Sequence, residues 1–206
     1  MAARGHEVEL WSLALEGAGL MVGPGVATHQ VPLAPRAGES VAGRVSRGAA
    51  ALADALRPAR PADIHHAQDL LSARALLALR AEGAVPHVIR TVHHVDAFPD
   101  RFLEDCQRAS IQDVDRCIAV SGFWADRLRD EFGVSAVVVP NGVDADRFAG
   151  CPLSRGEAGA RMGWGDRTVV LAVGGVQPRK GSRVLLEAFA RARGRLPERS
   201  LLVVAG

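Results

Sequence analysis

Short apolar runs rich in β-branched residues alternate along the chain with amphipathic stretches. The runs predict strands near residues 8–11, 64–66, 88–92, 117–120, 137–139, 169–173 and 201–205. A short helix tail at residues 2–4 precedes the first strand, with Gly5 at the expected C′ position. Apolar strands separated by helices indicate parallel pairing, because parallel strands need a crossover between them. The pattern therefore predicts an α/β fold of doubly wound type.

Three amphipathic stretches have the spacing of helices that cover a sheet. In each, apolar residues recur three or four positions apart behind a residue that favours the N-cap position. The potential N-caps are Asp69, Ser121 and Ser182. The stripes behind them are Leu70-Ala73-Leu77, Ala125-Leu128-Phe132 and Val184-Leu185-Ala188-Phe189-Ala192. We expect these helices to pack with their apolar stripes on the strands.

Residues 149–167 interrupt this regularity. The stretch holds Pro152, several glycines and several charges, with weak periodicity, which is typical of a linker or a loose surface helix. We therefore expect one α/β domain over residues 1–148, a linker over 149–167 and the start of a second domain over 168–206. The alternative is one domain whose sheet the last strands extend.

Both ends of the chain are predicted to be incomplete. A helical stretch of about four residues at the start cannot stand alone, because helix nucleation is unfavourable. At the other end, residues 169–205 predict one βαβ unit, whose sheet edges and apolar faces would be uncovered. We expect the chain to be a piece of a longer protein.

Composition excludes several classes of protein. The formal net charge of +2 is spread without basic blocks, which argues against a nucleic-acid partner. No run of 18 apolar residues and no signal peptide is present, so we expect no integral membrane segment and a cytoplasmic location. Cys106, Cys117 and Cys151 lack C-x-x-C spacing and fit reduced structural thiols.

The most informative segment for chemistry lies between the strand at 169–173 and the helix behind Ser182. It reads Gly174-Gly175-Val176-Gln177-Pro178-Arg179-Lys180-Gly181. Glycines let a backbone approach a ligand, a helix N-terminus offers free N–H groups, and Arg179 and Lys180 add positive charge. The segment therefore predicts a diphosphate site, with an ordinary βα turn as the alternative. It matches neither the P-loop nor the dinucleotide-binding pattern.

This segment, followed by Leu185-Leu186-Glu187-Ala188-Phe189, resembles the donor-phosphate loop and helix of family 4 glycosyltransferases. Residues 139–144 with Arg147 and Phe148 are similar to the N-G-V-D-x-x-x-F segment of that family. Within it, Pro140-Asn141-Gly142 predicts a turn after a buried strand, because Asn and Gly suit a positive φ. Thr91-Val92-His93 resembles its T-x-H at a strand end, and residues 118–121 resemble its strand-Ser-helix segment. The four matches occur in the family's order and span most of the chain.

The resemblance implies a GT-B fold of two Rossmann-like domains, and retaining transfer of a hexose from a UDP- or GDP-sugar to an acceptor hydroxyl. His93 would be the reactive-centre residue, and Gly174, Gly175, Arg179 and Lys180 would bind the donor phosphates. Candidates for the acceptor side or the interdomain cleft are His94, Asp96, Asn141 and Gly142. The resemblance implies no cofactor and no obligatory metal, with the donor and an unknown acceptor as partners. Peripheral association with the inner face of a membrane stays open.

The chain departs from the family pattern at two points. Gly174-Gly175 stands where the family often has Gly-Arg, so that Arg179 would have to replace the missing arginine. The Glu-x7-Glu segment that holds the donor sugar would lie beyond Gly206. The alternatives are a catalytically inactive fragment and a nucleotide-sugar epimerase of the same fold.

A metal-dependent hydrolase is a further alternative. His65-His66 and His93-His94 end two neighbouring predicted strands, with Asp69 and Asp96 close behind. Adjacent strand residues point to opposite faces, so that at most one histidine of each pair can readily serve one ion. We therefore expect no metal site here.

Overall fold

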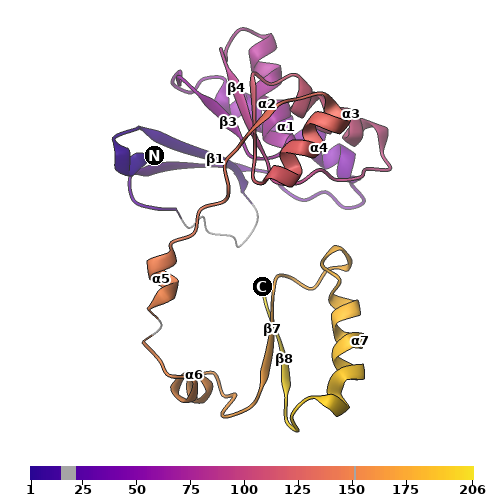
Figure 1. Ribbon diagram of the computed structural model, residues 1–206. Helices are drawn as coiled ribbons and strands as arrows, with labels where there is room; N and C mark the ends of the chain where they lie inside the picture. Colours follow the sequence, from indigo (N-terminus) through magenta and orange to yellow (C-terminus); the bar gives the residue numbers. More distant parts are fainter. Residues whose placement is uncertain (15–21, 151) are drawn as a thin grey trace. The chain divides into compact units, whose positions relative to one another are not determined.

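The predicted alternation of strands and helices is present along the chain (Figure 1). The computed structural model describes residues 1–14, 22–150 and 152–206, apart from the side chains of Arg147 and Arg179. It divides into two compact units, residues 1–142 and residues 143–206. Every pair of strands in the described residues is parallel, which confirms the predicted α/β class with parallel sheets.

Unit 1 contains two sheets. The smaller pairs β1 (Val8–Ala14) with β2 (Val26–Pro32). The larger has the strand order β3-β4-β5-β6. Its strands are β3 (His65–Ala67), β4 (Val88–Val92), β5 (Arg116–Ala119) and β6 (Ala136–Val138). Because the strands follow each other in chain order, the three crossovers run in one direction, and right-handed crossovers then place their helices on one face.

The helices of unit 1 begin at polar caps. They are α1 (Val41–Leu56), α2 (Leu70–Ala81), α3 (Arg101–Gln112) and α4 (Gly122–Phe132), behind a short 3-10 turn at Ala2–Arg4. The predicted caps of α2 and α4 are confirmed: Asp69 accepts from the Ser72 amide and Ser121 from the Trp124 amide. Gly5 has the predicted left-handed conformation, with φ of 85°.

Strand β2 and helices α1 and α3 were not predicted. Helix α1 does begin at a capping serine, Ser40, and α3 at a capping aspartate, Asp100. Gly48 on α1 lies close to Leu13 and Leu71, where a Cβ would come within 2.8 Å and 3.0 Å of their side chains. The helix therefore packs against β1 and α2 at a point where a larger residue would not fit.

The core of unit 1 lies between the helices and one face of the larger sheet. One buried cluster joins α1 and α2 to β3 and β4, and a second joins α3 and α4 to β4 and β5. Alternate strand residues explain this burial: Val88, Val92 and Ala119 are fully buried, whereas Val137, which alternates onto the other face, is exposed.

The end of unit 1 differs from prediction. The strand expected to be buried at residues 137–139 is the edge strand β6, and Val137 is 61% exposed. The turn expected at Pro140-Asn141-Gly142 is also wrong, because that segment has no turn and neither Asn141 nor Gly142 has a positive φ.

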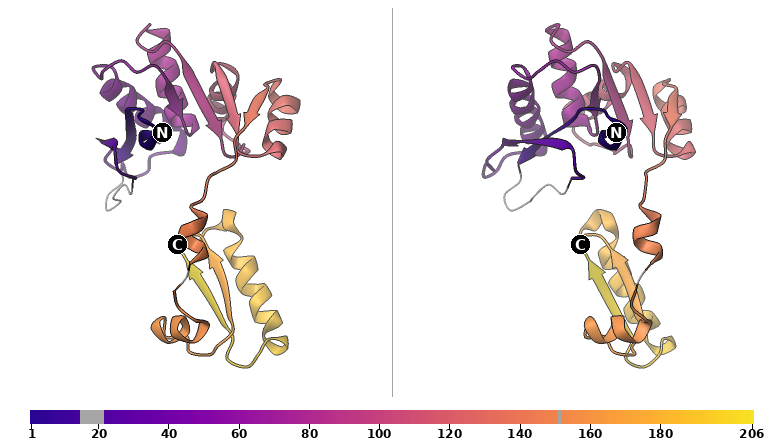
Figure 2. Two further views of the ribbon diagram at one scale, coloured as in Figure 1. Left: turned by 60° about the vertical axis from the view of Figure 1, so that its left-hand side comes forward. Right: turned by 90° about the vertical axis from the view of Figure 1, so that its left-hand side faces the viewer.

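Unit 2 contains one βαβ unit behind two short helices, α5 (Ala145–Ala149) and α6 (Arg155–Arg161). Strands β7 (Val169–Val173) and β8 (Leu201–Ala205) pair in parallel, and α7 (Ser182–Ala192) connects them beside the sheet (Figure 2). Short 3-10 turns at Pro178–Lys180 and Arg193–Arg195 flank α7. Helix α6 lies within the stretch predicted as a linker or surface helix.

The helices in the described parts of the chain are too short or too polar to cross a bilayer. Of the three cysteines, Cys106 and Cys117 are buried free thiols, and Cys151 lies outside the described residues.

Candidate functional site

The carboxyl ends of β3 and β4 bring three histidines of the sequence to one edge of the larger sheet. These strands are parallel neighbours, with His66 opposite Ile89. Parallel neighbours end at the same edge, so that Gln68, just after β3, lies near His93, just after β4. Open α/β sheets bind their ligands at this edge.

Hydrogen bonds join the two strand ends at this edge. Thr91 Oγ1 lies 2.8 Å from His66 Nε2, and Gln68 Nε2 donates to the same nitrogen over 3.3 Å. His93 Nε2 donates to Gln68 Oε1 over 3.0 Å. Thr91 and His93 are two residues apart and so reach the same side, which gives the T-x-H spacing a structural reason. We call His66, Gln68, Thr91 and His93 the His–Gln network.

Burial favours a neutral imidazole at His66, on this edge. The pKa of His66 is lowered from its ordinary value, mainly by burial and further by the charge of His93. His65 lies at the start of β3, opposite Val88, and its pKa is also lowered by burial, against a smaller opposing effect of its hydrogen bond to the His87 backbone. A neutral imidazole can donate one hydrogen bond and accept another, which suits contact with a hydroxyl.

His94 is turned to a different partner from His93. His94 Nε2 lies 3.1 Å from Asp96 Oδ2, and both side chains are about half exposed. Buried Gln107 on α3 holds the backbone at this point, because its Oε1 accepts from the Asp96 N–H and its Nε2 donates to the Asp96 carbonyl. The buried side-chain amide of Gln107 therefore fixes the loop after β4.

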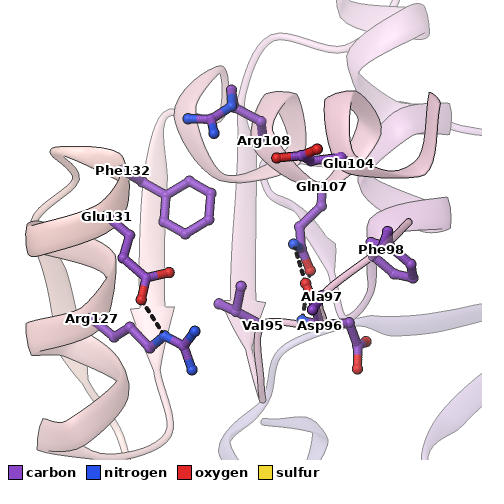
Figure 3. Close-up of a pocket in the computed structure, with 10 residues that line it drawn as sticks. All are labelled: Val95, Asp96, Ala97, Phe98, Glu104, Gln107, Arg108, Arg127, Glu131 and Phe132. Atoms are coloured by element: carbon purple, nitrogen blue, oxygen red, sulfur yellow. Dashed lines mark hydrogen bonds and ion pairs between the residues drawn. The ribbon is translucent and has the colours of Figure 1, made fainter. Parts of the chain in front are cut away.

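A hollow of about 260 Å³ lies beside this loop, between α3 and α4 (Figure 3). Its lining residues are Val95, Asp96, Ala97, Phe98, Glu104, Gln107, Arg108, Arg127, Glu131 and Phe132. Arg127 pairs with Glu131, and Arg108 lies over the Phe132 ring. Acidic and basic side chains both line the hollow and largely neutralise each other. The lining therefore favours neither an anionic nor a cationic ligand.

Asn141 and Gly142 do not join the His–Gln network through neighbouring strands. Both are exposed, in the extended segment after β6, and β5 lies between β6 and β4 in the sheet. Their predicted role at the acceptor side stays a prediction.

The paired histidines do not form a metal cluster. Within the described ranges, no three His, Cys, Asp or Glu side chains lie close enough together to hold an ion. His66 and His93 contact the amide of Gln68, and His94 contacts Asp96. The geometry gives no support to the hydrolase alternative.

The predicted phosphate loop in unit 2 is compact at its base. Gly174 has φ of 136°, and its N–H donates to the Ala205 carbonyl over 2.7 Å, which ties the end of β7 to β8. Lys180 is exposed at the end of a 3-10 turn, immediately before Gly181. The backbone of Arg179 is in the same turn, but its side chain lies outside the described residues.

The start of α7 differs from prediction in its cap. Gly181, with φ of 68°, is the N-cap, and it provides no side-chain cap for the first turn. Ser182 is instead the first helical residue and its Oγ accepts from the Gln177 N–H. The first-turn amides of α7 therefore lack the side-chain acceptor that Ser182 was expected to supply. The exposed Lys180 lies just before this turn in the sequence.

Sequence reasoning missed Gln68 and Gln107. Gln68 follows His66 by two positions, and this alternation past a strand end was the signal that could have placed it beside His93. Gln107 lies on a helix that was not predicted, so that nothing in the sequence pattern pointed to its contact with Asp96.

Comparison with known proteins matches the chain to carbohydrate enzymes. Over 96 residues it is 40% identical to a GDP-mannose-dependent alpha-(1-6)-phosphatidylinositol monomannoside mannosyltransferase of Mycolicibacterium smegmatis, covering 46% of this chain and 25% of the relative. It is 30% identical to a D-inositol 3-phosphate glycosyltransferase of Rhodococcus jostii over 232 aligned positions, covering all of this chain and 50% of the relative.

A third relative is a phosphatidyl-myo-inositol mannosyltransferase of Mycobacterium tuberculosis, 38% identical over 87 residues, or 42% of this chain and 22% of that protein. The chain thus spans at most about half the length of these relatives. The model of Glycosyltransferase Family 4 matches residues 1–147. The α/β units with parallel strands agree with the Rossmann-like domains of the GT-B fold. Because that family model covers well over half of its 206 residues, the chain belongs to glycosyltransferase family 4.

Proposed function

We propose that this chain forms the acceptor-side unit and the beginning of the donor-side unit of an enzyme that transfers a hexose from a nucleoside-diphosphate sugar to a hydroxyl, with retention of configuration. The observation that carries the proposal is His93 of a family 4 chain, held by Gln68 at the carboxyl edge of a parallel sheet. This edge is where such sheets bind ligands.

In the proposed reaction, the bond between the anomeric carbon and the diphosphate oxygen breaks and a bond to the acceptor oxygen forms. The diphosphate oxygen leaves with the bonding electron pair and an added negative charge, and the proton of the acceptor hydroxyl passes to that oxygen or to water. Lys180 and the first-turn amides of α7 would stabilise that charge. His93 would accept or donate a hydrogen bond at the sugar or acceptor hydroxyl, and no step requires a metal.

The names of the relatives narrow the proposed substrates. All three names contain inositol, and two name transfer of mannose, one of them from GDP-mannose. We therefore propose a mannosyl group from GDP-mannose as the first donor to test, and an inositol-containing acceptor. An inositol ring presents several hydroxyls, and a phosphate on it would add a charge for recognition.

The test is a product assay with radiolabelled GDP-mannose or UDP-glucose and either phosphatidylinositol vesicles or inositol phosphate. It would be run on the 206-residue chain and on the product of the whole reading frame that contains it. Chromatography would separate transferred sugar, free sugar and isomerised nucleotide sugar. The same reactions with a chelator would test the proposed independence from metal.

Label that moves to the acceptor would support transfer. Label that appears only as an isomerised donor would favour the epimerase alternative, and release of free sugar that chelation abolishes would favour the hydrolase. Transfer by the whole product alone would identify the 206-residue chain as a catalytically inactive fragment.

A further inference from the structure

One side-chain amide contacts both histidines of the His–Gln network. Gln68 Oε1 accepts from His93 Nε2 over 3.0 Å, and Gln68 Nε2 lies 3.3 Å from His66 Nε2. Gln68 is two positions after His66 in the sequence, whereas His93 is 25 positions after Gln68. The contact therefore exists only because β3 and β4 pair in parallel.

The two ends of an amide have opposite hydrogen-bonding roles. A carbonyl oxygen only accepts, so His93 must carry its proton on Nε2 to make the 3.0 Å bond. An amide NH₂ only donates, so His66 must present a lone pair on Nε2 and carry its proton on Nδ1. The Thr91 hydroxyl, 2.8 Å from the same nitrogen, then also donates to it.

This arrangement excludes a proton on His66 Nε2. Such a proton would face the NH₂ group of Gln68, and two donors cannot bond to each other. The depressed pKa of His66 agrees with a ring that stays neutral. The neighbouring side chains thus hold the two rings in opposite tautomers.

We propose that Gln68 is a positioning residue that holds His93 as the Nε2–H tautomer and leaves its Nδ1 as a hydrogen-bond acceptor at the sheet edge. A hydroxyl of a sugar or acceptor would then donate to Nδ1, so that the contact favours an oxygen that is giving up its proton. This meaning for catalysis rests on the proposed function, whereas the tautomer itself does not. His93 touches the substrate in this scheme, and Gln68 acts through it.

The test is the tautomeric state of both rings, read from the ¹⁵N shifts of the histidines in the 206-residue chain. Spectra would be recorded near pH 8, above the ordinary histidine pKa of about 6.5. His93→Gln and His66→Gln variants would identify the two sets of signals. We expect Nε2–H for His93 and Nδ1–H for His66.

Replacement of the amide sharpens the test. Gln68→Met keeps the length of the side chain without its hydrogen bonds, and we expect the two rings to lose their opposite tautomers. Gln112→Met is the matched control, because Gln112 donates to the Phe132 carbonyl at the far end of α3. That variant should leave both sets of signals unchanged.

A second variant keeps the proposal testable if Gln68→Met does not fold. The carboxylate of Gln68→Glu accepts at both oxygens, so both rings should then carry a proton on Nε2. His66 would change its tautomer and His93 would keep it. Opposite charge nearby should also raise the pKa of His66 from its lowered value.

The proposal is overturned if His93 carries its proton on Nδ1 in the unaltered chain. That tautomer would result if the oxygen and nitrogen of the Gln68 amide were exchanged, so that Nε2 of Gln68 faced His93. It is also overturned if Gln68→Met or Gln68→Glu leaves the tautomers of both rings unchanged. None of these measurements needs a donor or an acceptor. Failure of transfer in the product assay would therefore reject the proposed function without touching the role of Gln68.

Discussion

Two of the βαβ units in the described chain, one from each compact unit, have the same plan and different degrees of burial. In β3–α2–β4, four residues of the crossover helix are buried, among them Leu76 and Leu79. In β7–α7–β8, no residue of the crossover helix α7 is buried, and all of residues 182–192 are described. Val184, Leu185, Ala188 and Phe189 nevertheless form a regular apolar stripe. Val184 is 69% exposed.

The difference lies in what surrounds each unit. Helix α2 packs between α1 and α3 over a sheet of four strands, so that several elements cover its apolar residues. Helix α7 has two strands and short turns around it within unit 2. An apolar stripe thus predicts that a helix forms and which face packs, but the extent of burial depends on neighbouring elements.

The largest expected effect comes from truncating one leucine in each crossover helix. Leu79→Ala should lower the free energy of unfolding of unit 1 by about 2 to 5 kcal/mol, because Leu79 is only 1% exposed and its loss leaves a cavity. Leu186→Ala on α7, where the side chain is 55% exposed, should change stability by less than about 0.5 kcal/mol. Denaturant unfolding followed by circular dichroism measures both. Equal losses would show that α7 is buried in solution.

The next effect concerns the predicted phosphate loop of unit 2. Lys180→Ala should weaken binding of GDP-mannose by about 1.5 to 3 kcal/mol, because a charge-assisted hydrogen bond to phosphate is lost. Titration calorimetry on the product of the whole reading frame measures the affinity. Arg191→Ala, in the last turn of α7, is the matched control and should bind the donor normally. Unchanged affinity in Lys180→Ala would remove this residue from the phosphate site.

Replacement of His93 in unit 1, unlike that of Lys180, should change turnover and not donor affinity. His93→Ala should lower turnover by about tenfold, which corresponds to one hydrogen bond of about 1.4 kcal/mol, with little change in donor affinity. Initial rates over a range of donor concentrations separate the two quantities. His6→Ala, at an exposed position near the start of the chain, serves as control. A variant with normal turnover would identify His93 as a packing residue.

The helix caps provide a smaller contrast between the two units. Asp69→Ala should lower the stability of unit 1 by about 1 kcal/mol, because the Asp69 carboxylate accepts from the Ser72 amide in a capping box. Ser182→Ala should have a weaker effect, because Ser182 does not cap α7 and bonds to exposed Gln177. Thermal unfolding of both variants beside the unaltered chain tests this order, and a larger loss in Ser182→Ala would contradict it.

A change of pH should separate the units with the smallest perturbation. All seven histidines lie in unit 1, and the pKa values of His65 and His66 are lowered from 6.5 by burial. Their neutral forms stabilise the fold fully above about pH 6.5. This contribution is lost as the pH falls from 6.5 towards the lowered pKa values of the folded chain, because the unfolded chain then binds more protons than the folded chain. Hydrogen exchange should show weaker protection of unit 1 at pH 5.5 than at pH 7.5, and no such difference for unit 2. A His66→Gln variant should show less of this change.

Much of the secondary structure could be predicted because its causes are local. The strands at 88–92, 169–173 and 201–205 have the predicted bounds, and α2 and α4 start at the predicted caps. Helix α3 was missed even though Asp100 caps it, since its apolar stripe is short and many of its residues are charged. Ser182 was assigned as a cap because a serine before a stripe has that meaning on average, whereas here Gly181 takes the position.

The sequence by itself determined the parallel α/β class, most of the strands and the motifs that resemble family 4 glycosyltransferases, because periodicity, caps and motifs depend on neighbouring residues. Only the tertiary structure decided that β6 is an exposed edge, that Gln107 holds the loop at Asp96, and that Gln68 lies between His66 and His93. Those contacts join residues distant in sequence, and they depend on strand order and register. Many distant residues together set that order and register, so that no single stretch of sequence reveals them.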